Sequence, residues 1–346
     1  MSRHTTIKFG QRCIGVGNPT YIIAEIGSNH DQDLQLAMDM IYQAADSGAD
    51  AVKFQSIRFD QLYNPKTESN EFRKWFKKIE LNESWHVKLA ECARVAKIDF
   101  LSSPTYLDAV DLLVNCGVVA LKIASPQVQG NLALLKKAAA TRLPLILSMG
   151  YADYGDIARA LRICAEEDND QIVVLHCISK YPTLPSEARL GFIPTLASMT
   201  GFPVGYSDHT LGTYMAPVAV ALGACIIEKH VTTSKFRNGP DHHFALSFAE
   251  LREMVSKIRE VETALSDGTR LYLLPEELKH RDKVKFKAIS SKDLKKGDLL
   301  VHDSVIFLRS ERAGITQEEL GDPMRYCIRY EVPANTLLQW SDLQLR

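Results

Sequence analysis

The sequence lacks the features that mark disulfide-rich and nucleic-acid-binding proteins. Its seven cysteines are an odd number and include no C-x-x-C pair, which argues against a complete disulfide framework and predicts a reducing, cytoplasmic compartment. Neither charge is in excess, because 41 basic residues face 42 acidic ones. The chain therefore lacks the excess of basic residues that is typical of proteins binding nucleic acid or an anionic membrane, and we expect neither as a partner.

Long apolar runs are also missing. The first residues, MSRHTTIKFGQRC, lack the apolar stretch of a signal peptide. The longest apolar run, residues 215–227, contains Pro217 and is too short to cross a bilayer. We therefore expect no targeting segment and no membrane span.

What the chain has is a repeated alternation of short apolar runs with longer helical patterns. The eight runs are YIIAEIGS, DAVKFQS, DFLSSPT, ALKIASP, PLILSMG, IVVLHCIS, PVGYSDH and CIIEKHV. Segments between them, such as LQLAMDMIYQAADSGA and DIARALRICAEE, carry apolar residues at helical spacing. This predicts an α/β fold with a (β/α)8 (TIM) barrel. A doubly wound open sheet is the rival, but it usually has fewer strands, and no G-x-G-x-x-G follows the first run.

Near the C-terminus, the alternation of apolar runs with helical patterns gives way to short apolar stretches and turns. We expect the barrel over residues 1–268, a linker over 269–283, and a small β-rich domain over 284–346. The last region contains short apolar stretches separated by turn signals, Lys296-Gly297 and Pro333-Ala334-Asn335.

Polar residues gather where the predicted strands end, and in such a barrel that rim holds the active site. Residues two apart in a strand share a face. Three polar pairs have this spacing: Lys53 with Gln55, Ser207 with His209, and Glu228 with His230. Single polar residues end other strands: Glu25, Ser103, Lys122, Ser125 and Ser179. Several charges at one buried rim predict a ligand or metal that completes their pairing, because an unpaired buried charge is costly.

Two kinds of chemistry fit these residues. Lys53 and Lys122, together with the hydroxyls of Ser103, Ser125 and Ser207, make a pocket suited to phosphate. Separately, two imidazoles on the last two strands, at positions 209 and 230, are suited to a divalent cation.

Each residue also has an ordinary explanation. Lys53 alone is more simply a rim charge in a salt bridge. His176 is interpreted as a packed core residue. His242 and His243 follow a Gly-Pro turn, and one or both can be interpreted simply as solvated loop residues. The coincidence of eight strand ends, rather than any one residue, favours a site.

The motifs IIAEIGSNH, KIAS, LHCISKYP, GYSDHTLG and IEKHVTTSK…GPDHHFAL, in this order, resemble the sialic acid synthase family. That family comprises N-acetylneuraminate synthases and relatives that make legionaminic, pseudaminic and spore-coat sugar acids. The stretch AISSKDLKKGDLLVHDSV is similar to the family's antifreeze-like (SAF) domain. The resemblance covers essentially the whole chain.

The resemblance implies a reaction. Phosphoenolpyruvate condenses with the open-chain aldehyde of an N-acetylated amino sugar, which a divalent metal polarises. The products are a nine-carbon 2-keto-3-deoxy sugar acid and phosphate. The metal is expected to be Mn²⁺, with Mg²⁺ or Co²⁺ as alternatives. A homodimer is also implied, in which the SAF domain of one chain caps the barrel of the other.

The resemblance also assigns roles by position. The metal ligands are His209 and His230. The phosphoenolpyruvate-binding positions are Lys53, Ser103, Lys122, Ser125, Ser179 and Ser207. The sugar-facing positions are Glu25, Gln55, Gln127, Tyr181 and Asp241. Glu228, Glu25 and Lys53 are the expected catalytic residues.

The sequence departs from the family pattern at three places. Gln127 stands where many members have Glu near the sugar, and Ser179 stands where many have Asn near the phosphate. The C-terminal R-P-G turn, whose Arg reaches the partner's site, is replaced by LRSERAG, so Arg309 and Arg312 are both candidates.

These departures keep two alternatives open. One is a phosphoenolpyruvate synthase that uses a phosphorylated sugar, which would need a second basic pocket. The other is a non-catalytic paralogue that binds a sugar or acts in assembly.

Overall fold

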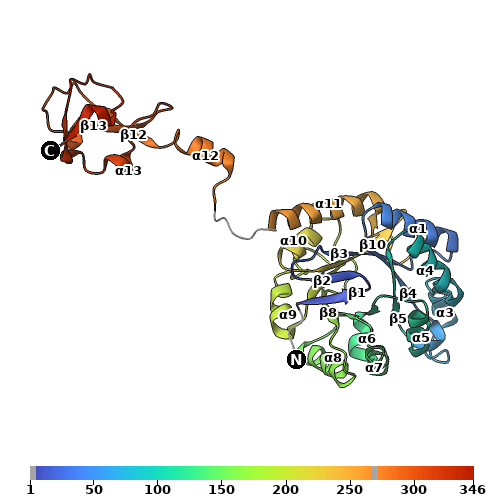
Figure 1. Cartoon of the computed structure of the whole chain (residues 1–346). Helices are drawn as coiled ribbons and strands as arrows, with labels where there is room; N and C mark the ends of the chain where they lie inside the picture. Colours follow the sequence, from blue (N-terminus) through green and yellow to red (C-terminus); the bar gives the residue numbers. More distant parts are fainter. Residues whose placement is uncertain (1–4, 266–271) are drawn as a thin grey trace. The chain divides into compact units, whose positions relative to one another are not determined.

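The structure is a computed structural model that describes residues 5–265 and 272–346. The chain divides into two compact units, Met1–Ser266 and Asp267–Arg346, which are described separately (Figure 1). The expected end of the barrel at residue 268 falls outside the described residues. A short helix, α12 (Pro275–Arg281), lies within the segment expected to be a linker.

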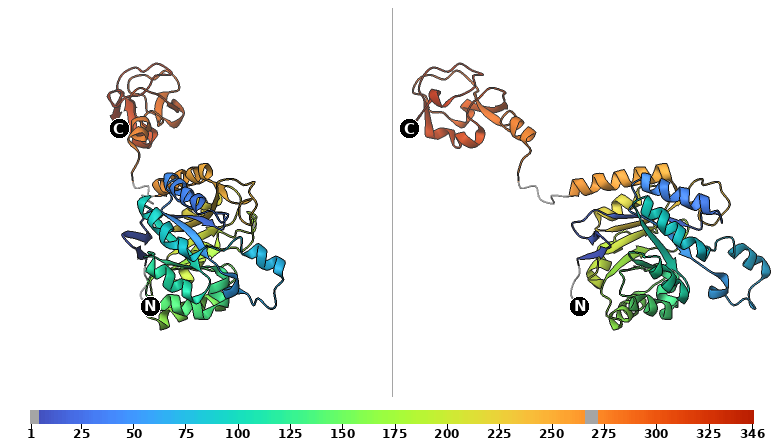
Figure 2. Two further views of the ribbon diagram at one scale, coloured as in Figure 1. Left: turned by 90° about the vertical axis from the view of Figure 1, so that its right-hand side faces the viewer. Right: turned by 45° about the vertical axis from the view of Figure 1, so that its right-hand side comes forward.

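The first unit is a nearly closed barrel of eight parallel strands surrounded by helices (Figures 1 and 2). The strands are β3 (Tyr21–Gly27), β4 (Ala51–Ser56), β5 (Asp99–Pro104), β6 (Leu121–Ile123), β7 (Leu145–Ser148), β8 (Ile172–Cys177), β9 (Val204–Asp208) and β10 (Ile226–Thr232). Their order is β5-β4-β3-β10-β9-β8-β7-β6, and the two end strands, β5 and β6, lie against each other. The predicted TIM barrel and each of its eight strands are confirmed.

Helices follow the strands and cover the outside of the barrel. They are α1 (Leu34–Asp46), α4 (His86–Val95), α5 (Leu107–Asn115), α6 (Ser125–Gly130), α7 (Leu132–Ala140), α8 (Tyr154–Glu166), α9 (Phe192–Thr200), α10 (Met215–Ala221) and α11 (Phe248–Leu265). Helix α1 shows why these segments are helical. The Asp33 side chain caps its N-terminus by accepting hydrogen bonds from first-turn N–H groups. The buried face of the helix is formed by Ala37, Met40, Ile41 and Ala44.

Two apolar layers result from the alternation of side chains along each strand. Outward residues such as Val52 and Tyr206 pack under the helices, and inward residues such as Ile23 and Ile146 fill the barrel. A hairpin that was not predicted, β1 (Thr6–Phe9) with β2 (Arg12–Gly15), adds Ile7, Phe9 and Ile14 to the inner layer. The inner layer is therefore apolar toward the N-terminal ends of the strands and polar toward their C-terminal ends.

An arm that the sequence did not predict projects from the barrel between β4 and α4 (Figure 2). It contains α2 (Phe59–Leu62), α3 (Asn70–Phe76) and the 3-10 helix η1 (Glu83–Trp85). Stacked and edge-on rings of Phe59, Tyr63, Phe72 and Phe76 hold it together. The arm is thus a local aromatic cluster beside the C-terminal end of β4.

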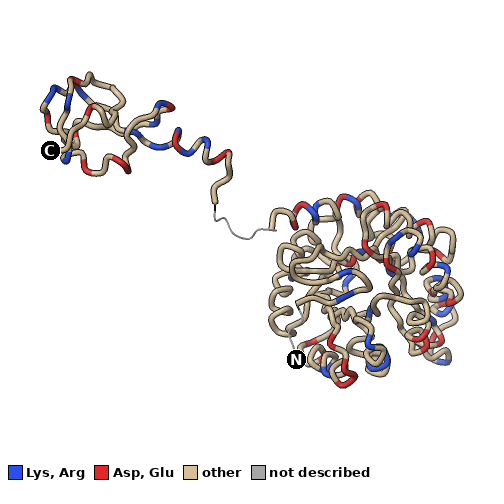
Figure 3. The backbone as a smooth tube through the Cα atoms, viewed as in Figure 1, with Lys and Arg blue, Asp and Glu red and all other residues tan. Residues whose placement is uncertain are grey.

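The second unit is small and rich in short strands. Its elements are α12, β12 (Phe286–Ser290), η2 (His302–Ser304), β13 (Val305–Arg309), α13 (Gln317–Leu320), η3 (Pro323–Arg325), β14 (Tyr326–Ile328), η4 (Trp340–Asp342) and β15 (Leu343–Leu345). Strands β12 and β13 pair antiparallel, as do β14 and β15, around a separate apolar core. Acidic and basic residues are interspersed in both units (Figure 3). No helix in the described part of the chain is long and apolar enough to cross a membrane.

Candidate active site

The inward side chains at the C-terminal ends of the strands are polar. Ile226 belongs to the apolar layer inside the barrel, so Glu228 and His230, two and four residues further on, also face inward. The same alternation turns Lys53 and Lys122 inward, since Lys53 pairs in register with inner Leu101 and Lys122 with inner Ile146. The predicted residues on these strands therefore share one end of the barrel.

A buried charge network joins four of these strands. Lys53 Nζ lies 2.7 Å from Glu25 Oε2 and 3.8 Å from Glu228 Oε2, and Lys122 Nζ lies 3.2 Å from Glu228 Oε1. The Ser207 hydroxyl donates to Glu228 Oε1 at 3.0 Å, and Lys53 Nζ donates to Ser103 Oγ at 3.2 Å. All these side chains are buried. Two acids and two ammoniums thus balance each other away from water.

The two acids of the network differ in their pKa. Burial raises the pKa of Glu25 to about 6 despite the neighbouring Lys53. Burial alone would also raise the pKa of Glu228, but Lys122 and Lys53 outweigh it and lower that pKa to about 2. Carboxyl groups whose pKa values are pushed apart are suited to different tasks. Glu228 is held ionised, whereas Glu25 can exchange a proton near neutral pH.

The buried polar atoms that have no hydrogen-bond partner among the described residues include three at this end: Glu228 Oε2, His230 Nδ1 and Ser148 Oγ. Buried polar atoms are nearly always paired, so each such atom calls for an explanation. Ser148 ends β7 and faces the same way as inner Ile146. A ligand bound at this end of the barrel would give all three atoms a partner.

The two predicted metal ligands lie side by side, with ring centroids 5.6 Å apart. His209 Nδ1 is 2.8 Å from the Ile178 carbonyl oxygen, so this nitrogen carries the proton and Nε2 keeps its lone pair. Burial lowers the pKa of His230 well below its ordinary value, which keeps the ring neutral, the form that binds metals. His230 Nδ1 lies 3.9 Å from Asp241 Oδ2.

This donor set fits a divalent ion whose remaining positions are filled by small molecules. Among residues 5–265 and 272–346, no group of three or more His, Cys, Asp or Glu side chains is arranged to hold a metal. Two imidazoles, one with an unpartnered nitrogen, would leave several positions open. Catalytic metal sites characteristically keep such open positions for water or substrate.

The serine hydroxyls converge beside Gly150. Ser125 Oγ accepts a hydrogen bond from the Gly150 N–H at 2.9 Å. A Cβ atom on Gly150 would lie 2.1 Å from Ser179 Oγ and 2.6 Å from Ser125 Oγ. Only glycine therefore lets Ser125 and Ser179 approach each other. The sequence analysis missed Gly150 and Ser148, although both stand in the SMG that ends the fifth predicted strand.

Other predicted residues meet around Gly27. Gln55 Nε2 donates to Glu25 Oε1 at 2.8 Å, and the Ser28 hydroxyl lies 3.4 Å from Asp241 Oδ2. A Cβ atom on Gly27 would touch all three predicted side chains, Glu25, Gln55 and Asp241. These residues from β3, β4 and the loop after β10 therefore form one polar wall.

The remaining predicted residues are two in the barrel and two in the second unit. The Tyr181 ring centroid lies 4.2 Å from that of His209, and Gln127 is buried on α6. In the second unit, the guanidinium of Arg309 lies over the Phe286 ring, and the Arg312 carbonyl accepts from Lys287.

The two histidines after the Gly-Pro turn have different environments. His243 is exposed. His242 is fully buried, with Nδ1 2.7 Å from Thr232 Oγ1 and Nε2 3.0 Å from Asp31 Oδ1. The interpretation as a solvated residue is therefore wrong for His242, which connects the loop carrying Asp241 to the loop after β3.

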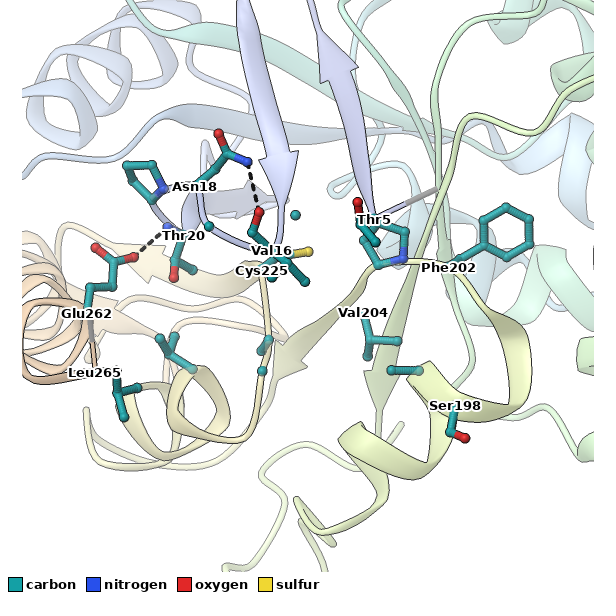
Figure 4. Close-up of a pocket in the computed structure, with 18 of the residues that line it drawn as sticks. Thr5, Val16, Asn18, Thr20, Ser198, Phe202, Val204, Cys225, Glu262 and Leu265 are labelled. Atoms are coloured by element: carbon teal, nitrogen blue, oxygen red, sulfur yellow. Dashed lines mark hydrogen bonds between the residues drawn. The ribbon is translucent and has the colours of Figure 1, made fainter. Parts of the chain in front are cut away.

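The apolar end of the barrel holds a cavity of about 680 Å³ (Figure 4). It lies beside the N-terminal ends of β9 and β10, where Val204 and Cys225 form part of its wall, together with the loop before β3. Glu262 and Leu265 of α11 complete it. None of the predicted site residues lines this cavity.

Comparison with known proteins shows which family and which solved structures the chain is similar to. A family model described as NeuB family matches residues 40–270. N,N'-diacetyllegionaminic acid synthase of Legionella pneumophila is 36% identical over 94% of this chain and 94% of that protein. A solved N-acetylneuraminic acid synthetase of Leptospira borgpetersenii is 36% identical, covers 80% of this chain and 95% of its own, and superposes with a TM-score of 0.73. Spore coat polysaccharide biosynthesis protein SpsE of Bacillus subtilis matches over 99% of both chains with 32% identity and a TM-score of 0.69.

Proposed function

The chain belongs to the NeuB family of sialic acid and other nonulosonic acid synthases, and from this premise we propose its substrates and the roles of its residues. The proposed reaction joins phosphoenolpyruvate to the open-chain aldehyde of an N-acetylated amino sugar. The observation that carries this proposal is the buried network in which Lys53 and Lys122 converge on Glu228 beside the imidazoles of His209 and His230.

The bond changes in this reaction balance as follows. Carbon 3 of phosphoenolpyruvate forms a bond to the aldehyde carbon of the sugar, whose oxygen takes up a proton. Water adds to carbon 2, and the bond between carbon 2 and the phosphate oxygen breaks. Inorganic phosphate and a nine-carbon 2-keto-3-deoxy sugar acid leave.

Phosphoenolpyruvate is proposed to bind to the two ammoniums and to the serine hydroxyls. Lys53 and Lys122 neutralise its charge, as they neutralise Glu25 and Glu228 in the ligand-free protein. The hydroxyl groups that would contact the ligand are those of Ser103, Ser125, Ser148, Ser179 and Ser207. Ser148 joins this set because its buried hydroxyl has no partner among the described residues.

Two carboxyl groups are proposed to act on the reacting atoms. Glu228 stays ionised and fixes the positions of Lys53 and Lys122 through its two oxygens. Glu25, with a pKa of about 6, holds or releases a proton at a carboxyl oxygen at neutral pH. His209 and His230 would hold a divalent ion, Mn²⁺ by preference and Mg²⁺ or Co²⁺ as alternatives, which when bound supplies Lewis-acid polarisation of the aldehyde oxygen.

The sugar is proposed to contact the polar wall around Gly27, formed by Glu25, Gln55 and Asp241, with Tyr181 and Gln127 also facing it. The relative from Legionella pneumophila is named for a di-N-acetylated product. We therefore propose a di-N-acetylated 6-deoxyhexose as the first sugar to test, with N-acetylmannosamine second.

The test is phosphate release from phosphoenolpyruvate with Mn²⁺ against a panel of N-acetylmannosamine, its 6-phosphate and di-N-acetylated 6-deoxyhexoses. We expect release with one unphosphorylated sugar and none after chelation of the metal. Release with a phosphorylated sugar alone would show the second kind of synthase. Sugar binding without turnover, in folded protein that binds Mn²⁺, would show a non-catalytic paralogue.

The wider setting of the enzyme is also part of the proposal. Because phosphoenolpyruvate is made in the cytoplasm, the protein is proposed to act there. We further propose a homodimer with the C-terminal domain, residues 284–346, as an antifreeze-like (SAF) module. Light scattering of the full chain tests the dimer, and a monomeric mass during turnover would contradict it.

A further inference from the structure

A second buried ion pair lies behind the two histidines, on the opposite face of the strands. On β10, the outward residues Ile227 and Val231 pack under the helices. Lys229, between them, also points outward. On β9, Asp208 follows outward Tyr206 with the same spacing. Two charged side chains therefore lie in the apolar layer between the strands and the helices.

This ion pair is dry and its polar atoms are satisfied. The exposed fraction of the side chain is 1% for Lys229 and 0% for Asp208, and Lys229 Nζ lies 2.8 Å from Asp208 Oδ2. The other carboxylate oxygen accepts from the Thr210 N–H at 2.8 Å and from the Thr210 hydroxyl at 2.7 Å. Lys229 Nζ also donates to the Thr210 carbonyl at 2.5 Å. Three residues thus form a closed network.

The position of the network relates it to the histidines. Each charged residue directly precedes one of them, in the sequences Asp208-His209 and Lys229-His230. The parallel pairing of β10 with β9 reaches Lys229 and Asp208 and goes no further. His209 is therefore one residue beyond the ladder, where backbone hydrogen bonds between the two strands no longer hold it.

The ammonium of Lys229 connects the two strands beyond the last residues that pair in the ladder. It binds the residues on both sides of His209, namely the Asp208 side chain and the Thr210 carbonyl. It belongs to the residue next to His230. One side chain therefore links the two strand ends that carry the imidazoles, whose ring centroids are 5.6 Å apart.

Stability alone gives no reason for a buried ion pair at this place. Removing two charges from water is costly, and apolar residues of similar volume are often as stabilising or more so. Groups that orient metal ligands from behind, by contrast, commonly change metal affinity by about tenfold to 100-fold. From this geometry we propose that Asp208 and Lys229 are positioning residues that fix the spacing of His209 and His230 as a metal-binding pair. The inference rests on the proposed function, which makes the two histidines metal ligands.

The decisive variant removes both charges and keeps their volume: Asp208→Leu combined with Lys229→Met in the full chain. Binding of Mn²⁺ is measured from the electron paramagnetic resonance signal of the free ion, without substrates. We expect the Kd for Mn²⁺ to rise by about tenfold to 100-fold. The thermal midpoint of the metal-free protein should stay within about 4 °C of the parent's, because no charge is left buried without a partner.

Two further measurements separate positioning from a general structural effect. With Co²⁺ in place of Mn²⁺, the visible absorption bands should shift in the double variant, because they report the geometry around the ion. The matched control, Arg259→Met with Glu262→Leu, removes an ion pair with a 3.0 Å separation near the N-terminal end of the barrel. Its Kd for Mn²⁺ should stay within about twofold of the parent's, since no contact links that pair to the histidines.

The outcomes are distinguishable. Parent protein that binds no divalent ion overturns the proposed metal role and this inference with it. Parent and double variant that bind Mn²⁺ equally well overturn the inference and leave the proposed function standing. If the double variant does not fold, Thr210→Val carries the test, because it removes only the hydroxyl bond to Asp208. Its Kd should then rise about threefold or more, and an unchanged Kd would contradict the proposal.

Discussion

The two ends of the barrel both carry acidic and basic residues, but these are satisfied differently. Near the N-terminal end, Asp50 is ion-paired with Arg12 and Arg259 and accepts a hydrogen bond from the Ile22 N–H. At the C-terminal end, Glu228 Oε2 and His230 Nδ1 are buried without a hydrogen-bond partner. The first set is paired within the protein, whereas the second leaves buried atoms without a partner.

The cavities show the same contrast. The N-terminal end holds about 680 Å³ of largely apolar space, lined by several glycine, alanine and valine residues. The C-terminal end holds converging charges and hydroxyls. Glu228 and His230, which carry unpaired buried atoms that a ligand could bind, are predicted site residues, whereas no predicted site residue lines the empty volume.

The largest expected effect is at the charged end. Lys122→Met should lower kcat/KM by about 1000-fold or more, because it removes a cation from the phosphate pocket and leaves Glu228 with one distant ammonium. Phosphate release measures the activity, and circular dichroism verifies folding. The matched control is Lys137→Met, which breaks a solvent-accessible pair with Asp111 and should leave kcat/KM within about twofold. Parental activity in folded Lys122→Met would remove Lys122 from the site.

A second prediction concerns an unpartnered buried atom that does not belong to the site. His30 is buried against Phe54 and Trp85, and its Nδ1 accepts from the Gln32 N–H. The neutral ring therefore carries its proton on Nε2, which has no partner among the described residues. Burial lowers the pKa of His30 to about 4.

The sign of the pH effect follows from that shift. Between pH 6.5 and 4 the unfolded chain binds a proton at His30 and the folded chain does not, so stability falls as the pH falls. This group alone should remove about 3 kcal/mol from the free energy of unfolding over that range. His30→Asn, which keeps an acceptor for Gln32, should show a correspondingly smaller loss between pH 7.5 and pH 4 in urea titrations. Equal losses in both proteins would show that His30 titrates normally.

The third prediction tests the completed charges of the N-terminal end. Asp50→Ala should cost about 2 kcal/mol of stability, because the Ile22 N–H loses its acceptor and Arg12 and Arg259 lose their partner. Below the melting range, kcat/KM should stay within about twofold. Asp50→Asn, which keeps the acceptor, should recover part of the stability. A large loss of turnover in folded Asp50→Ala would mean that this end is coupled to the chemistry.

The eight strands of the barrel could be predicted from the sequence, whereas the hairpin and the arm could not. The eight strands were predictable because each is a nearly continuous buried run that ends in polar residues. The β1–β2 hairpin was missed because its strands have four residues each and are partly exposed. The arm between β4 and α4 was missed because its rings pack on one another and show no barrel period.

For the site, residues on the strands were predictable and those placed by loops were not. Lys53, Glu228 and His230 lie within strands, where alternation gives the direction of their side chains. His242 looked solvated because its burial depends on Asp31, about 200 residues away in the chain, folding onto it. The unpaired state of Ser148 Oγ is likewise a property of packing, which no local pattern records.

The smallest expected effect comes from adding carbon at the apolar end. Ala197 on α9 lines the cavity, and Ala197→Leu extends into space that is already empty. Stability should change by no more than about 0.5 kcal/mol and kcat/KM by no more than about twofold, because alanine and leucine both favour helices and no polar group is touched.

The matched variant adds one methyl group at the other end. In Gly150→Ala the new Cβ atom meets the hydroxyls of Ser125 and Ser179, which must move apart. We expect the KM for phosphoenolpyruvate to rise by about tenfold or more, because two donors leave their positions. Steady-state kinetics on both variants measures the difference. Equal effects of Ala197→Leu and Gly150→Ala would mean that the two ends do not differ in function, and that unpaired polar atoms are no better guide to this site than cavity volume.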